Sequence, residues 1–164
     1  MLAKAARQAL FIWGAMMAVL LFYPVLAWVV ASKRLETPMP PAFALPVLAL
    51  LAVAALAGGL LFVRASFTDA ALSKAPAAVP PTDIPALPPR DRQLFAVLSY
   101  GRTRLIIAWA FFEAIGVYGV ICVFLGHPAE RMLPFVAVAL AAMALHRPRL
   151  MELVERADTL LPRI

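Results

Sequence analysis

The sequence predicts an all-α, polytopic membrane protein with four transmembrane helices and a Pro-rich cytoplasmic loop. Of its 164 residues, 64% are hydrophobic and 15% are charged, whereas soluble domains carry about 45–50% apolar and about 25% charged residues. A domain of this size leaves roughly a third of its chain surface exposed, so the surplus apolar side chains must face lipid. We therefore interpret residues 1–164 as a single membrane domain.

Four apolar segments have the length that a membrane crossing requires, roughly 17–25 helical residues, or come close to it. They are residues 10–31, 42–63, 105–125 and 132–146. The last segment is short, about 22 Å as a helix, so a re-entrant hairpin is the alternative to a full crossing there. The first segment exceeds the apolar core of a signal peptide, which has about 7–15 residues, and we expect it to be retained.

The basic residues predict the orientation in the membrane. Twelve of the fifteen lysine and arginine residues lie before the first segment, between the second and the third, or after the fourth. Cytoplasmic loops carry such an excess. We therefore expect both termini and the middle loop to be cytoplasmic, in the inner (plasma) membrane of a bacterium.

The loop at residues 65–103 changes composition abruptly. Six of its prolines fall within a short stretch: Pro76, Pro80, Pro81, Pro85, Pro88 and Pro89. Proline lacks an N–H group and interrupts helices, so this stretch is expected to be extended and mobile.

Short amphipathic helices are expected on either side of the last two crossings. Structure should resume at Asp91, with Leu94, Phe95 and Leu98 on one face of a segment that lies in the headgroup region. The tail at 147–164 has apolar residues at helical spacing and is predicted to form a second interfacial or solvated helix.

Glu113 is the main functional clue, because it lies near the middle of the third segment. An ionised, unpaired carboxylate at the bilayer centre costs roughly 3 kcal/mol or more. It should therefore be protonated, or paired inside the bundle. Tyr118, five residues later, is a candidate hydroxyl partner. Two hypotheses follow: a proton or cation site, or a neutral acid that hydrogen-bonds a neighbouring helix.

The run from Glu113 to Ile121, EAIGVYGVI, resembles the outer helix of the c subunit of rotary ATP synthases, where an acidic residue in a similar small, aromatic and glycine pattern binds H⁺ or Na⁺. The resemblance implies that Glu113 carries the ion. The chain departs from that family in its long Pro-rich loop and its two further helices.

A second resemblance covers more of the chain. The AFFE centre (Ala110 to Glu113), the Phe124-Leu125-Gly126 exit and the His146-Arg147-Pro148 end are similar to a group of small four-helix bacterial membrane proteins without an assigned activity. This resemblance implies the architecture and no mechanism.

Small residues predict where helices approach one another closely, because they let backbones pack without intervening side chains. The predicted packing positions are Ala55, Gly59, Ala110, Gly116, Gly119, Ala137 and Ala141. They are expected to join helices within the chain or to join copies of it. Most of the aromatic residues Trp13, Trp28, Trp109, Tyr23 and Tyr100 are expected to anchor the helices at the membrane interface.

The function predicted from these features is that of a non-enzymatic accessory, assembly or interaction subunit of an inner-membrane complex. The alternative is proton or cation binding or translocation through Glu113. We expect no enzyme activity, because one intramembrane carboxylate does not make a multi-residue site. His127 and Glu130 supply only two ligands, too few for a metal site. The expected partners are the lipid bilayer and other membrane subunits or further copies, with no nucleic acid and no cofactor.

Overall fold

The computed structural model describes residues 2–33, 41–78 and 87–160, and every element within these ranges is helical. The elements are α1 (Leu2–Ser32), α2 (Ala44–Ser66), α3 (Asp69–Ala78), α4 (Pro89–Phe124), the 3-10 helix η2 (Ala129–Met132), α5 (Leu133–Leu145) and α6 (Leu150–Leu160). The all-α prediction is confirmed for these residues.

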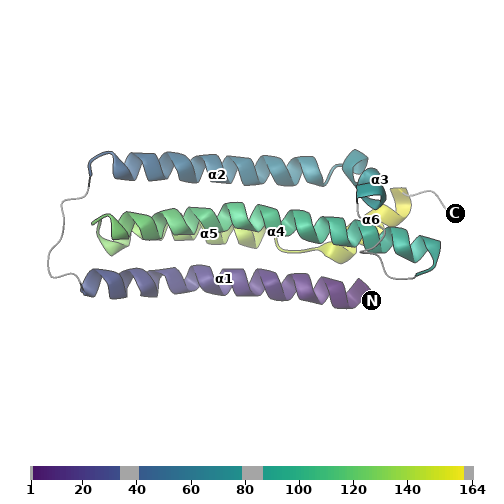
Figure 1. Ribbon diagram of the computed structural model, residues 1–164, viewed down its shortest axis with the longest axis horizontal. Helices are drawn as coiled ribbons and strands as arrows, with labels where there is room; N and C mark the ends of the chain where they lie inside the picture. Colours follow the sequence, from purple (N-terminus) through teal and green to yellow (C-terminus); the bar gives the residue numbers. More distant parts are fainter. Residues whose placement is uncertain (1, 34–40, 79–86, 161–164) are drawn as a thin grey trace.

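Four helices, α1, α2, α4 and α5, run along the long axis of the molecule (Figure 1). The central helix is α4, with α1 and α2 on opposite sides of it and α5 behind it. The beginning of α1 lies at the same end of the molecule as α3 and α6. Successive long helices (α1, α2, α4 and α5) therefore alternate in direction, so that α1 and α4 run parallel to each other (Figure 1).

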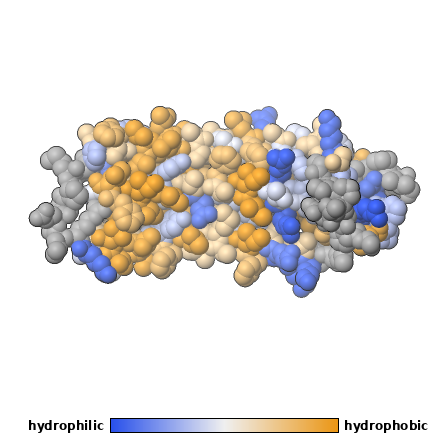
Figure 2. Space-filling model, in the orientation of Figure 1, coloured by the Kyte–Doolittle hydropathy of each residue, from blue (hydrophilic) through white to orange (hydrophobic). Residues whose placement is uncertain are grey.

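Three of these helices, α1, α2 and α4, are long and apolar enough to cross a membrane. A fourth candidate is the segment Ala129–Leu145 together with Leu150–Leu160, two pieces that are bent by 43° at the break between them. Hydrophobic side chains cover most of the length of the bundle, and hydrophilic ones gather toward the end with α3 and α6 (Figure 2). The shape and surface are those of a membrane protein.

The helices extend beyond the predicted apolar segments, chiefly at the basic end. Helix α1 begins at Leu2 instead of residue 10, and α4 begins at Pro89 instead of residue 105. Lys4, Arg7 and Arg102 therefore lie within helices. Charged side chains limit how far a helix can enter hydrocarbon, but they do not end the helix itself.

The sequence predicted a separate amphipathic segment in the headgroup region before the third crossing. This prediction is wrong, because α4 is one continuous helix from Pro89 to Phe124. Its 36 residues span about 54 Å, so its first four turns project beyond a hydrocarbon core of about 30 Å. There Val97 packs with Leu72 and Ala157, and Leu98 packs with Val154 and Ala5. We call α3, α6 and residues 89–104 of α4 the helical cap.

The prediction of an extended chain from Pro76 onward is also corrected in part. Residues 69–78 form α3, and Pro76 lies inside it. Leu72 and Ala75 are fully buried against the rest of the helical cap, and this packing outweighs the one backbone hydrogen bond that Pro76 removes. The expectation for Pro80, Pro81 and Pro85 concerns residues outside the described part of the chain.

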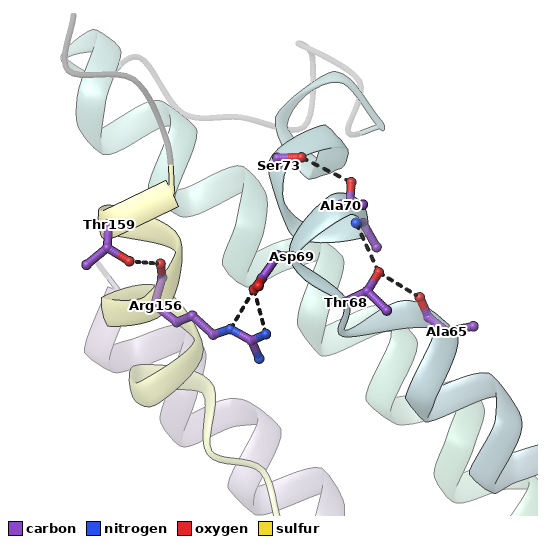
Figure 3. A network of polar contacts seen from close by, with 8 residues as sticks. Ala65, Thr68, Asp69, Ala70, Ser73, Arg156 and Thr159 are labelled. Carbon is purple, nitrogen blue, oxygen red and sulfur yellow. Dashed lines mark hydrogen bonds and ion pairs between the residues drawn. The ribbon is translucent and has the colours of Figure 1, made fainter.

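Polar contacts join α3 to α6 within the helical cap (Figure 3). Thr68 caps α3, since its hydroxyl accepts a hydrogen bond from the Ala71 amide at 3.2 Å. Asp69 Oδ1 accepts hydrogen bonds from Arg156 Nε at 2.9 Å and Nη2 at 2.5 Å. Both side chains are half exposed, so the pair contributes at most about 1 kcal/mol, and the buried apolar contacts provide most of the stability of the cap.

Candidate functional site

Glu113 lies half-buried on α4, at its contact with α1. The hydroxyl of Tyr23, in the second half of α1, donates a hydrogen bond to Glu113 Oε1 at 3.2 Å. A carboxyl group in an apolar span needs such a partner. Tyr23 was expected at the membrane interface; the structure places it instead opposite the intramembrane carboxyl.

Gly116 makes this contact possible, because it lies one turn after Glu113 on the side of α4 that faces α1. A Cβ atom there would come within 2.5 Å of Leu20 Cδ2 and 3.2 Å of the Tyr23 ring. The missing side chain therefore leaves a notch that receives both residues. Glu113 and Gly116 together form the centre of the α1–α4 joint.

Tyr118 lies elsewhere on α4. Its side chain lines a groove of about 540 Å³ between α2 and α4, and no hydrogen bond joins it to Glu113 among the described residues. We call this the α2–α4 groove; its walls are Leu51, Ala54, Ala55, Ile107, Ala110, Phe111, Ala114 and Tyr118. The structure thus assigns Tyr23 as the hydroxyl partner of Glu113, and the ion-binding role of Tyr118 stays a prediction.

Three of the predicted packing positions lie at close helix contacts. A Cβ atom on Gly59 would come within 2.6 Å of the Phe112 ring of α4. One on Gly119 would come within 2.8 Å of Met132 Cγ and 2.9 Å of Phe135 Cβ. With Gly116, these glycines let α2, η2–α5 and α1 approach α4. Ala55 is half-buried in the α2–α4 groove.

The other three predicted packing positions, Ala110, Ala137 and Ala141, are exposed. They are not buried between helices of this chain, and their contact with further copies stays a prediction. Helix α5 instead buries the opposite face: Phe135, Val136, Ala139, Ala142 and Met143. All its residues are apolar apart from Pro134, so the sequence has no polar face from which its orientation can be read.

Two tryptophans bind the end of α5, which the sequence did not reveal. Trp13 Nε1 donates to the Met143 carbonyl at 3.0 Å, and Trp109 Nε1 donates to the His146 carbonyl at 3.1 Å. The last carbonyls of a helix lack N–H donors within it, and the two indoles supply such donors here. Trp109 is fully buried, so it is a core residue and not the lipid-facing anchor that was expected.

Metal-binding side chains do not cluster within the described ranges: no three His, Cys, Asp or Glu residues come together. His127 lies at the turn between α4 and η2, and Glu130 lies within η2. Cys122 is buried in the main apolar core. Within the described residues, the candidate site for acid–base or ion chemistry is therefore the pair of Tyr23 and Glu113 at the α1–α4 contact.

No protein-family model, curated protein sequence or solved structure matches this chain. The two resemblances noted in the sequence therefore stay predictions.

Proposed function

We propose that this chain is a non-enzymatic accessory or assembly subunit of a bacterial inner-membrane complex, and that the α2–α4 groove receives a transmembrane helix of another subunit. The observation that carries the proposal is the groove itself. Ala54, Ala110 and Ala114 line it within the apolar band, and Ala54 and Ala110 are exposed. Small residues are typical of contacts between membrane helices.

A blocking substitution tests the groove. Ala110→Trp places a large ring on an exposed position and is expected to lower recovery of the partner by at least about tenfold, the effect of losing about 1.4 kcal/mol of binding free energy. The measurement is co-purification from native membranes, with each co-purifying chain quantified against the bait.

Ala18→Trp is the matched control, because Ala18 is exposed on α1 and lies two residues from Leu20, which contacts Gly116. Ala18 therefore lies within about one helical turn of Ala110 along the bundle axis, but outside the α2–α4 groove. It should leave co-purification unchanged. Equal recovery of the partner by both variants would refute the groove as the binding surface.

The proposed topology has four crossings with both termini in the cytoplasm. The tryptophan contacts support a full fourth crossing, since Trp13 and Trp109 lie in the first turns of the apolar segments 10–31 and 105–125 and both reach the end of α5. Helix α5 therefore extends to the depth at which those segments begin.

Reporter fusions test this topology. A reporter that is active only after export should be inactive when fused after Ala75 or after Ile164, because the basic residues at that end favour the cytoplasm. Activity of both fusions would show the opposite orientation. Activity of the Ile164 fusion alone would show that the fourth segment does not cross as proposed.

Proton or cation binding by Glu113 is the second candidate function, and the Tyr23 hydrogen bond is the observation that favours it. If Glu113 only stabilises the contact between α1 and α4, Glu113→Gln should change the free energy of unfolding by about 1 kcal/mol. The coupling energy between Glu113→Gln and Tyr23→Phe in a double-mutant cycle should then be about 0.6 kcal/mol, as for polar contacts between membrane helices. Unfolding in mixed detergent micelles measures both. An ion-dependent stabilisation of the wild type that Glu113→Gln abolishes would favour the ion-binding function instead.

A further inference from the structure

A recess at the basic end of the bundle combines positive charge with an apolar wall. It lies between the first turns of α1 and the connection from α5 to α6, with a volume of about 750 Å³. We call it the basic recess; its lining consists of Ala6, Arg7, Leu10, Arg147, Pro148, Arg149, Leu150, Met151 and one carboxylate, Glu152. We propose that the basic recess binds the phosphate group of an anionic phospholipid, an inference that does not depend on the proposed function.

The charges of the recess are largely uncompensated. Arg149 contacts Glu152 at 3.7 Å, with both side chains mostly exposed. Within the described ranges no carboxylate pairs with Arg7 or Arg147. Elsewhere in the helical cap, Asp69 pairs with Arg156 and Asp158 pairs with Arg90. Three guanidinium groups against one carboxylate favour an anion.

Positive charge also continues around α1. Arg7 borders a second recess, which Lys4 and Arg102 line with it. Helix α6 begins at Leu150, inside the basic recess, and its first N–H groups have no carbonyl acceptor one turn earlier. The N-terminal end of α6, where the helix dipole favours negative charge, therefore lies beside the arginines.

The depth of the recess matches that of lipid phosphates. Trp13 and Trp109 bind the end of α5 at the edge of the apolar band. Arg7 precedes Trp13 by six residues, about 9 Å along the helix, and Arg147 directly follows His146. Both arginines therefore lie just outside the hydrocarbon, where headgroup phosphates are found.

The apolar wall distinguishes a lipid from a free phosphate. Leu10 is 39% exposed and Met151 is 45% exposed, and both line the recess that the arginines border. A soluble phosphate ester would satisfy the arginines and leave these side chains in water. A phospholipid satisfies both, because its acyl chains cover apolar surface while its phosphate accepts from the guanidinium groups.

The test measures lipid binding to the purified full chain. Wild type, Arg7→Gln/Arg147→Gln and the control Arg64→Gln/Lys74→Gln are reconstituted in nanodiscs of phosphatidylcholine with increasing phosphatidylglycerol, and bound lipid is counted by native mass spectrometry. The recess variant is expected to bind phosphatidylglycerol about 30-fold more weakly than wild type, the effect of losing two basic contacts. The control removes the same charge at the same end of the bundle, outside the recess, and should bind like wild type.

Several outcomes would overturn the proposal. Equal losses in both double variants would show a diffuse effect of surface charge. Binding of soluble glycerol 3-phosphate as tight as that of phosphatidylglycerol would show a free-phosphate site. If the glutamine variant fails to fold, the charge-preserving variant Arg7→Lys/Arg147→Lys replaces it in the test. This variant should retain most of the phosphatidylglycerol binding. Loss of binding with the fold intact by circular dichroism would contradict electrostatic recognition.

Discussion

Replacing Trp109 by alanine is expected to lower the free energy of unfolding by about 3–5 kcal/mol, the cost of deleting a fully buried aromatic side chain. Trp109 has no exposed surface and lies on the central helix, and its indole binds the His146 carbonyl at 3.1 Å. The substitution removes packing in the main core and leaves the His146 carbonyl without its indole donor, while Trp13 still donates to the Met143 carbonyl. Unfolding in mixed detergent micelles, followed by circular dichroism, measures the change.

Two further tryptophan variants separate the causes. Trp109→Phe keeps most of the volume and removes the N–H donor, so about 1 kcal/mol should be lost. Trp28→Ala is the matched control, because Trp28 is 67% exposed and its removal should have little effect on packing within the chain. If Trp109→Ala costs no more than Trp28→Ala, then Trp109 does not occupy the core position described here.

Replacing Gly119 by alanine is expected to destabilise the fold by about 1–3 kcal/mol, as overpacking does in a closely packed core. The new Cβ atom would come within 2.9 Å of Phe135 Cβ and 3.2 Å of the Met132 carbonyl oxygen. These atoms belong to the backbone or are fixed to it, so rotation of a side chain cannot relieve the clash. The contact of α4 with η2 and α5 must widen.

Gly14→Ala is the control in the same assay, and its expected effect on the free energy of unfolding has the opposite sign. A Cβ atom on Gly14 would meet nothing within 4 Å, and alanine has a higher helix propensity than glycine by about 1 kcal/mol. The control should therefore be neutral or stabilising. Equal effects of the two substitutions would contradict the predicted approach of α5 to Gly119.

The sequence predicted the apolar segments well, because membrane hydrocarbon constrains composition directly. It predicted the helix ends poorly, since hydropathy detects where a segment leaves lipid and not where its hydrogen bonding stops. Helix α4 continues through Arg102 and Arg104 for this reason. The segment around Leu98 has the pattern of an interfacial helix, and a protein surface formed by α6 satisfies that pattern equally well.

The candidate site was predicted in part. Glu113 is conspicuous as a carboxylate in an apolar segment, but its partner Tyr23 lies 90 residues away in the sequence. No local spacing connects the two. Gly116 was correctly predicted at a close helix contact, because only glycine leaves room for side chains of the neighbouring helix. Ala137 and Ala141 were predicted from a uniformly apolar segment, and the rotation of such a helix about its axis is determined only by the surrounding helices.

The most direct test of the proposed function is complementation of a strain that lacks this gene, with Glu113→Gln and Ala110→Trp compared at equal expression. The subunit function predicts that Glu113→Gln restores the deletion phenotype fully, since glutamine retains hydrogen-bonding capacity toward Tyr23, and that Ala110→Trp does not, since it blocks the α2–α4 groove. The opposite result, with Ala110→Trp active and Glu113→Gln inactive, would contradict the account and identify Glu113 as the group that carries the activity.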